Sequence, residues 1–261
     1  MERILIILEK EWRELRHERG LIASSLAFPL LLTAISIVVV FALGRVPDEE
    51  TGELGAALAD PALAGLPIDQ LGQAIMGRQF GLLFLMMPLV VPTVLAAYSI
   101  VGEKTRRTLE PLLATPIATW ELLLGKSLAA LIPATVITWF CAALFVCGVA
   151  LGALTPQIFA LIISPEWLLM LLVWSPLLAL LAIALSVLVS ARVNDPRTAQ
   201  QISGVVIIPV MGLFFGQLAG AIVVSAAFVA GVSLALLVID ALAIRLAVLV
   251  FQRERILTRW T

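Results

Sequence analysis

Residues 120–128 read WELLLGKSL and end in Gly-Lys-Ser, the three residues that close an ATP-binding phosphate loop. That loop also needs a glycine five positions before the Gly-Lys pair, on a turn between a strand and a helix. The residue at that position is Trp120, and helix-forming apolar residues continue past Ser127. The stretch is therefore predicted not to bind a nucleotide, and no other glycine-rich nucleotide loop, EF-hand or CxxC motif occurs in the sequence.

Side chains that carry enzymatic or metal chemistry are scarce. The chain has one histidine, His17, near its N-terminus, so histidine-based nucleophiles and histidine metal clusters are not expected within a membrane. Cys141 and Cys147 are six residues apart, which on a helix separates them by about 9 Å and turns them about 120° apart. That arrangement excludes a disulfide. We expect no catalytic residue and no cofactor bound by this chain.

Asp240 is the one acid that falls deep within an apolar stretch. An ionised acid at the centre of a bilayer costs about 2.5–3.5 kcal/mol, so such residues face a partner or a pathway. Arg245 follows five residues later, off the three- or four-residue spacing that pairs side chains on one helix. A structural polar contact with another helix is the preferred interpretation, and a pathway residue is the alternative.

The elements that must position these residues are strongly apolar. The chain of 261 residues is 61% hydrophobic and 13% charged, with a mean hydropathy of +1.09. A soluble domain has about 45–50% apolar and about 25% charged residues. Six stretches reach the length of about 20 residues that spans a bilayer: 21–43, 80–101, 127–151, 167–190, 202–223 and 228–251. We predict an all-α polytopic membrane protein, with the break before the last span at 216–220 or at 224–226.

The distribution of Lys and Arg predicts the orientation. Cytoplasmic loops carry an excess of these residues, and here they gather at both termini and in two of the predicted connections. Both termini are therefore predicted to be cytoplasmic, with residues 44–79 as an extracytoplasmic loop and residues 102–126 as a cytoplasmic segment. The six spans form one transmembrane domain over residues 21–261.

Residues 1–20 have the pattern of an amphipathic helix. Ile4, Leu5, Leu8, Trp12 and Leu15 recur at helical spacing, and charged residues occupy the other side. Trp and Arg suit the lipid headgroup layer, so an interfacial helix is the preferred interpretation. A solvated cytoplasmic helix is the alternative.

Two cytoplasmic connections are more patterned than simple loops. In residues 102–126 a short helix is expected to present Leu109, Leu112 and Leu113 along one apolar edge, which suits docking on a soluble partner. A turn lying on the lipid is the alternative. A second helix is expected to begin at Thr119 and to continue into the third span.

In that second helix, Gly125 would allow close packing and Lys126 would lie at the headgroups. In the other patterned connection, Asn194-Asp195-Pro196 marks a helix start, because proline is tolerated in a first turn.

The run EKTRRTLEPLLATP, residues 103–116, resembles the signature of ABC-2 type transporter permeases. Arg107 stands where that family often has glycine. SARVNDPRTAQQ, residues 190–201, and FQRERILTRW, residues 251–260, resemble the second inner loop and the C-terminal end of the same family. The resemblance extends over essentially the whole chain.

The resemblance implies a non-catalytic permease subunit of an ATP-driven exporter in the plasma or inner membrane. A second permease copy or a paralogue and two separate ATPase subunits, which hold ATP and Mg, are the expected partners; no nucleic acid is expected. The expected cargo is hydrophobic or amphipathic, drug-like or lipid-like. A sodium- or ion-exporting permease and a non-transporting anchor for a cytoplasmic ATPase are the alternatives. The implied ATPase-coupling residues are Glu103, Arg106, Arg107, Leu109, Glu110, Leu112 and Leu113.

Overall fold

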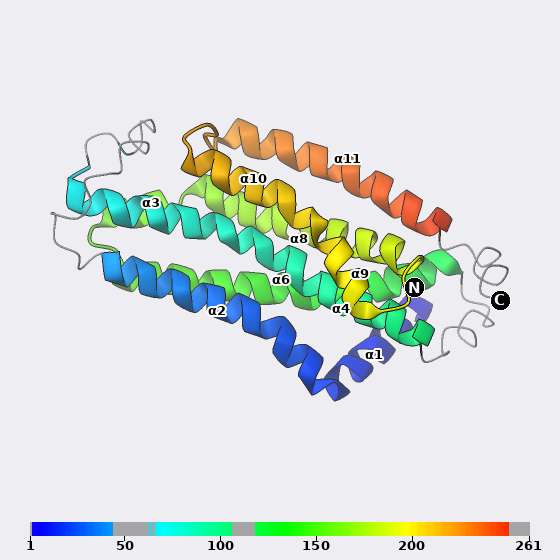
Figure 1. Ribbon diagram of the computed structural model, residues 1–261. Helices are drawn as coiled ribbons and strands as arrows, with labels where there is room; N and C mark the ends of the chain where they lie inside the picture. The colour runs from blue at the N-terminus through cyan, green and yellow to red at the C-terminus, as the bar shows by residue number, and fades with distance from the viewer. Residues whose placement is uncertain (1, 44–62, 64–65, 106–117, 251–261) are drawn as a thin grey trace.

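A computed structural model describes residues 2–43, 63, 66–105 and 118–250, and the described residues contain helices and no β-strand (Figure 1). Six helical segments are long and apolar enough to cross a membrane. Their bounds are Arg19–Leu43, Gln70–Glu103, Trp120–Gly152, Pro156–Ser190, Pro196–Leu218 and Ala226–Val250. The chain is thus a multi-pass, all-α membrane protein, as predicted.

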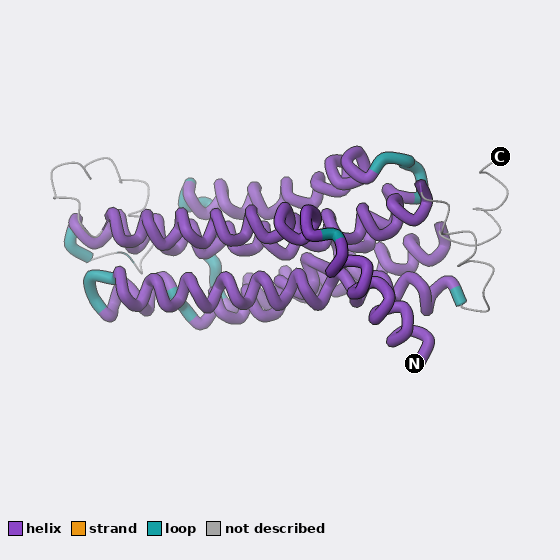
Figure 2. Tube along the Cα trace, turned by 90° about the horizontal axis from the view of Figure 1, so that it is seen from below, coloured by secondary structure: helices purple, strands orange, loops and turns teal. Residues whose placement is uncertain are grey.

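The helices pack into a bundle in which their axes are roughly aligned (Figure 2). They are α1 (Glu2–His17), α2 (Arg19–Leu43), α3 (Ile68–Leu83), α4 (Met87–Thr105), α6 (Thr119–Gly152), α7 (Pro156–Ile162), α8 (Pro165–Ser190), α9 (Pro196–Ser203), α10 (Ile207–Leu218) and α11 (Ala226–Val250). Two short 3-10 segments, η3 (Phe84–Met86) and η4 (Gly204–Val206), join α3 to α4 and α9 to α10. Each of these joined pairs forms a single span.

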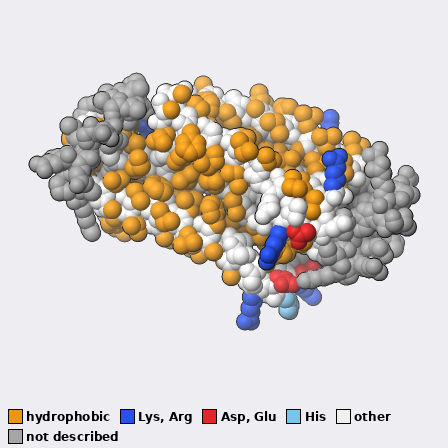
Figure 3. All heavy atoms as spheres, viewed as in Figure 1, with side chains coloured by type: hydrophobic (Ala, Val, Ile, Leu, Met, Phe, Trp, Pro, Cys, Tyr) orange, Lys and Arg blue, Asp and Glu red, His pale blue; other side chains and the backbone are white. Residues whose placement is uncertain are grey.

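The two ends of the bundle differ in character. At one end, here called the α1 end, lie α1, the last turn of α4, the first turn of α6 and the last turn of α11 (Figure 1). At the other end, the α3 end, α2 stops and α3 begins. Charged side chains gather toward the α1 end, while apolar side chains cover most of the remaining face (Figure 3). The charged side chains seen on this face thus lie mainly at one end of the bundle.

The centre of the bundle is α4 with α8. The span containing α4 is 78% buried within the protein, against 22% for α2 and 17% for the span containing α10. Near the α3 end, the rings of Phe84, Phe145 and Trp167 pack with centroids 4.9–6.4 Å apart, and the Trp167 indole N–H donates to the Gly81 carbonyl at 2.9 Å. This aromatic cluster joins η3, α6 and α8. The outer helices consequently leave broad apolar faces for lipid.

Three predicted boundaries are confirmed. Helix α6 begins at Thr119. Helix α9 begins at Pro196, where the Asp195 carboxylate accepts a hydrogen bond from the Thr198 backbone N–H at 2.8 Å and closes the first turn. Residues 219–225 separate α10 from α11, and Gly220 adopts the positive φ of 70° that glycine accommodates. The cysteines are also free, as expected.

The prediction that residues 68–79 belong to an extracytoplasmic loop is wrong, because α3 already begins at Ile68. Its polar residues have internal partners. The fully buried Gln73 side chain donates to the carbonyls of Val40 and Gly152 at 2.7 and 2.8 Å, and accepts from the Leu154 N–H at 3.0 Å. One amide thus satisfies backbone groups at the ends of α2 and α6, a role that the sequence does not reveal.

The orientation can be tested with single cysteines in a background that lacks Cys141 and Cys147. A cysteine at Glu166, where α8 begins at the α3 end, should react with a membrane-impermeant thiol reagent on intact cells, because the distribution of Lys and Arg predicts that this end is outside. A cysteine at Arg197, at the start of α9, should react only after lysis. The reverse pattern at either position would contradict the six-span orientation.

Candidate functional site

Lys126, the lysine of the Gly-Lys-Ser stretch, is buried at the α1 end of the bundle. Its side chain is only 5% exposed, and its Nζ lies 2.6 Å from Glu11 Oε1 of α1 and 2.8 Å from Glu103 Oε2 of α4. The same Nζ donates to the Ser99 hydroxyl at 3.0 Å. Lys126, which was expected among the lipid headgroups, is therefore enclosed by protein, because two carboxylates hold it between the helices.

The close approach of α1 to α6 depends on the residue before this lysine. A Cβ atom at Gly125 would lie 2.7 Å from the Ile7 side chain and 3.4 Å from the Ile4 carbonyl. Only a glycine leaves that space, so Ile7 is buried against α6. One turn further along α1, Glu11 is carried to Lys126 on the same helical face, and the Trp12 indole contacts the Ala129 carbonyl at 3.4 Å. The predicted packing role of Gly125 is confirmed.

This packing modifies the predicted face of α1. Ile7 and Glu11 are the buried residues, whereas Leu5 is 60% exposed on another side of the helix. An acid at the centre of the packed face was not expected from the apolar pattern. The helix is amphipathic as predicted, but its most buried polar group, the Glu11 carboxylate, binds side chains of α6 and α4.

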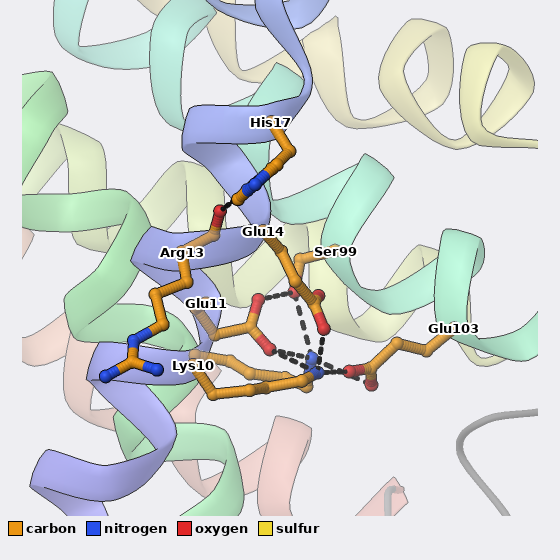
Figure 4. Close-up of polar contacts among 8 residues, drawn as sticks. Lys10, Glu11, Arg13, Glu14, His17, Ser99 and Glu103 are labelled. Atoms are coloured by element: carbon orange, nitrogen blue, oxygen red, sulfur yellow. Dashed lines mark hydrogen bonds and ion pairs between the residues drawn. The ribbon is translucent and has the colours of Figure 1, made fainter.

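The network extends from α1 to the last turns of α4 (Figure 4). Ser99 donates to Glu11 Oε2 at 2.7 Å, and the Lys10 ammonium pairs with Glu103 and, at 3.1 Å, with Glu14. Figure 4 shows these side chains converging between the helices, while Arg13 points away from them. We call Lys10, Glu11, Ser99, Glu103 and Lys126 the ion cluster. It joins three helices that are distant in sequence.

The charges in the ion cluster support one another. Burial by itself raises the pKa of Glu11, but the adjacent Lys126 ammonium and the Ser99 hydroxyl outweigh it and bring the pKa below its usual value of 4.5. Burial likewise opposes the charge of Lys10, yet its contacts with Glu103, Glu11 and Glu14 raise its pKa above the usual value. Both groups are therefore charged at neutral pH.

Carboxylate oxygens of Glu11, Glu14 and Glu103 lie within 4.8 Å of one another, a spacing that could hold a metal ion. The Lys10 and Lys126 ammonium groups already stand among these oxygens. A cation would have to displace an ammonium group to bind there. The arrangement is consequently assigned to ion pairing.

Of the predicted coupling residues, Glu103 lies within the ion cluster. Arg106, Arg107, Leu109, Glu110, Leu112 and Leu113 fall outside the residues that the structure describes. The helices that flank this segment, α4 ending at Thr105 and α6 beginning at Thr119, both stop at the α1 end (Figure 1). The described residues on either side of this segment thus lie at the same end of the bundle as the ion cluster.

Asp240 lies apart from the ion cluster, on the side of α11 that is buried. It is 3% exposed and shares this side with Leu236, Ala243 and Ala247. Within the described part of the chain, neither of its carboxyl oxygens has a hydrogen-bond partner. Arg245 is exposed on another side of α11 and does not pair with Asp240, in agreement with the five-residue spacing.

The sequence did contain a signal for the ion cluster. Glu11 interrupts the apolar positions of α1 one turn after Ile7, and Lys126 follows a glycine within a helix that continues into a span. Each feature is ordinary alone. Their pairing across 115 residues emerges only when the helices are packed.

Removing Lys126 should destabilise the protein strongly. Lys126→Met leaves Glu11 and Glu103 buried without their shared cation, which is expected to cost about 3–5 kcal/mol. The matched control is Arg13→Met, which removes an ion pair to Glu9 from a side chain that is 74% exposed and should cost about 0–1 kcal/mol. Both losses of stability are measured by heating the purified proteins and then assaying the folded fraction by size-exclusion chromatography. Equal melting temperatures for the two variants would contradict a structural role of the ion cluster.

Comparison with known families matches residues 5–240 to the ABC-2 family transporter protein family. The match begins within α1 and ends at Asp240, so it includes the ion cluster and all six spans except the last turns of the sixth. No curated protein matches the sequence. Permeases of this family generally work with ATPase subunits. The chain therefore belongs to the ABC-2 transporter family and is a permease, the membrane-spanning component of an ABC transport system.

Proposed function

We propose that this chain is the permease subunit of an ATP-driven exporter of hydrophobic or amphipathic molecules. Two copies, or one copy and a paralogue, would form the translocation path and dock two cytoplasmic ATPase subunits. ATP and Mg would be held by those partners. Glu103 would attach the coupling segment to the bundle. The residues that contact the ATPase would lie in the segment that follows it, including Arg106, Arg107, Leu109, Glu110, Leu112 and Leu113.

The observation that carries this proposal is the attachment of Glu103 to the bundle. Glu103 is the first residue of the proposed coupling segment, and its carboxylate pairs with Lys126 of α6 and Lys10 of α1. A force applied to the segment by a partner would consequently reach three helices at once. A loop attached only through its backbone would transmit less.

The position of α4 suggests how such a force would reach the centre of the membrane. This helix has extensive packing against α8 and α6, and its span is the most buried of the six. A tilt of α4 and α6 about their α1 ends would move the packed centre, whereas α10 packs against fewer helices and α11 packs mainly against α8. ATP-driven movement at the coupling segment would therefore open or close a path along α4.

Truncating the apolar edge of the coupling segment should weaken capture of the ATPase. Leu112 and Leu113 would leave water only in the complex, at roughly 1.5–3 kcal/mol for each side chain fully buried. Leu112→Ala/Leu113→Ala should reduce affinity by about one to three orders of magnitude, since about 1.4 kcal/mol is tenfold. Pull-down of the cognate ATPase, with transport and hydrolysis assayed on the same preparation, is the measurement.

The matched control is Leu30→Ala/Leu31→Ala, which removes two exposed leucines from the lipid side of α2. This variant should capture the ATPase as the unaltered protein does. Glu110→Lys should uncouple hydrolysis from transport with a smaller effect on assembly, because charges around an apolar contact set its register. Unaltered capture by Leu112→Ala/Leu113→Ala would mean that the segment lies on lipid.

A second candidate function is ion export, and the observation that favours it is the buried, unpaired carboxyl group of Asp240. An ionised carboxylate there requires a cation or a partner from another subunit, whereas a protonated one does not. A sodium exporter would use the ionised carboxylate of Asp240. The exporter of hydrophobic or amphipathic molecules proposed above does not depend on it.

Asp240→Asn separates these two functions, because the amide keeps the shape of the carboxyl group but cannot ionise. We expect the variant complex to retain transport of a hydrophobic compound within about twofold, and its ATPase activity to be indifferent to sodium. Substrate-stimulated hydrolysis in reconstituted vesicles measures this. A sodium-dependent activity that Asp240→Asn abolishes in a folded complex would establish the ion exporter instead. Hydrolysis stimulated by neither sodium nor a hydrophobic compound would indicate a non-transporting anchor.

A further inference from the structure

A cavity of about 550 Å³ lies between α2, α4 and the span that contains α9 and α10, and we call it the α4–α9 cavity. Ser24 lines it from α2, Leu89 and Tyr98 from α4, and Arg197 and Ile207 from the third span. Its volume falls within the range of about 300–1,000 Å³ that is usual for small-molecule sites. Among the described residues that line it, none belongs to the ion cluster.

Two antiparallel helices give the cavity a polar end and an apolar end. Helix α4 ends and α9 begins toward the α1 end of the bundle, so Tyr98 and Arg197 both lie on that side (Figure 1). Leu89 precedes Tyr98 by nine residues and Ile207 follows Arg197 by ten, which places both apolar residues about 13 Å or more further into the bundle. The lining therefore changes from polar to apolar along the bundle axis.

The polar end presents hydrogen-bond donors. The Arg197 guanidinium carries N–H donors and no acceptor, and the Tyr98 hydroxyl and the amides of Gln200 and Gln201 can donate as well. In the part of the chain that the structure describes, the side chains of Tyr98, Gln200 and Gln201 make no hydrogen bond. A ligand group that accepts hydrogen bonds and carries negative charge is consequently the complement of this end.

The charge of Arg197 is available to a ligand. Asp195, two residues earlier, attracts the Arg197 side chain, but no ion pair between described residues joins the two. The Asp195 carboxylate instead accepts hydrogen bonds from the backbone N–H and the hydroxyl of Thr198, at 2.8 and 2.7 Å. The guanidinium thus retains its donors at the wall of the cavity.

The acids near the cavity are already engaged. Glu11, Glu14 and Glu103 line the neighbouring space between α1, α2 and α4, and each pairs with a lysine of the ion cluster. Glu18, which lines the same space, also has an interaction of its own. Because lysines offset these carboxylates, the choice of ligand depends on the donors around Arg197.

From this arrangement we infer that the α4–α9 cavity binds an amphiphile with an oxoanion head, taken from the lipid leaflet at the α1 end. The head lies at Arg197 and the two glutamines, and the alkyl chain follows Leu89 and Ile207. A planar guanidinium matches both a phosphate ester and a carboxylate, so these two heads form one class of ligand. The inference rests on the proposed function, because it names the class of cargo that the permease takes up.

The test uses four probes with the same twelve-carbon chain: dodecyl phosphate, dodecanoate, dodecanol and dodecyltrimethylammonium. Binding to the purified full chain in a maltoside detergent is measured by native mass spectrometry. We expect each of the two anions to bind at least about tenfold more tightly than the alcohol or the ammonium probe, because hydrogen bonds to a charged group are the stronger ones. Tighter binding of dodecyl phosphate would identify the cargo as a phosphate-headed lipid, and tighter binding of dodecanoate would identify it as a fatty acid. Binding of dodecanol or dodecyltrimethylammonium as tight as that of the anions would overturn the inference.

Matched variants place the head within the cavity. Arg197→Gln should lower the affinity for both anions about tenfold, whereas Arg192→Gln, which removes an exposed arginine outside the cavity, should not. Tyr98→Phe removes only a hydroxyl group and should weaken both anions by a smaller factor, with the affinity for dodecanol less affected. Equal effects of Arg197→Gln and Arg192→Gln would contradict the inference. Because no ATPase is present in this experiment, its failure is distinct from a failure of the coupling segment to capture one.

Discussion

Burying a charged side chain costs much free energy unless an opposite charge pairs with it. This constraint organises the α1 end of the bundle. Lys126 is buried because Glu11 and Glu103 meet it, and each of the three comes from a different helix. Replacing all of them with apolar residues could preserve packing, but losing one would leave an isolated buried charge. The position of α1 therefore depends on that of α4 and α6, and theirs on α1.

The sequence was sufficient for features that depend on local or additive properties. Six spans follow from apolar length, the α6 start at Thr119 from the residues around it, and the α9 start from an Asp-Pro cap. It was insufficient where a polar residue finds a distant partner. The helical residues 68–79 read as loop because Gln73 and its neighbours are polar, and nothing local indicates the carbonyls of Val40 and Gly152. The burial of Lys126 was missed for the same reason, since Glu11 is 115 residues away.

The bundle divides its tasks between a packed centre and a loosely held periphery. Helices α4 and α8 are surrounded by neighbours, and the ion cluster and the aromatic cluster fix them near opposite ends. Helix α2 and the span that contains α10 are instead mostly exposed on the outside of the bundle. A permease needs both properties. A partner can transmit movement only through a rigid part of the bundle, and a cargo can enter only at an accessible part.

The distance in sequence between Glu11 and Lys126 also has a consequence for how the protein is made. At about 5–20 residues per second, synthesis of the intervening 115 residues takes roughly 6–23 s. During that interval Glu11 has no buried cation to pair with, so its carboxylate must remain in contact with water. Helix α1 is consequently translated well before it can reach its final place, which it takes when α6 packs against it.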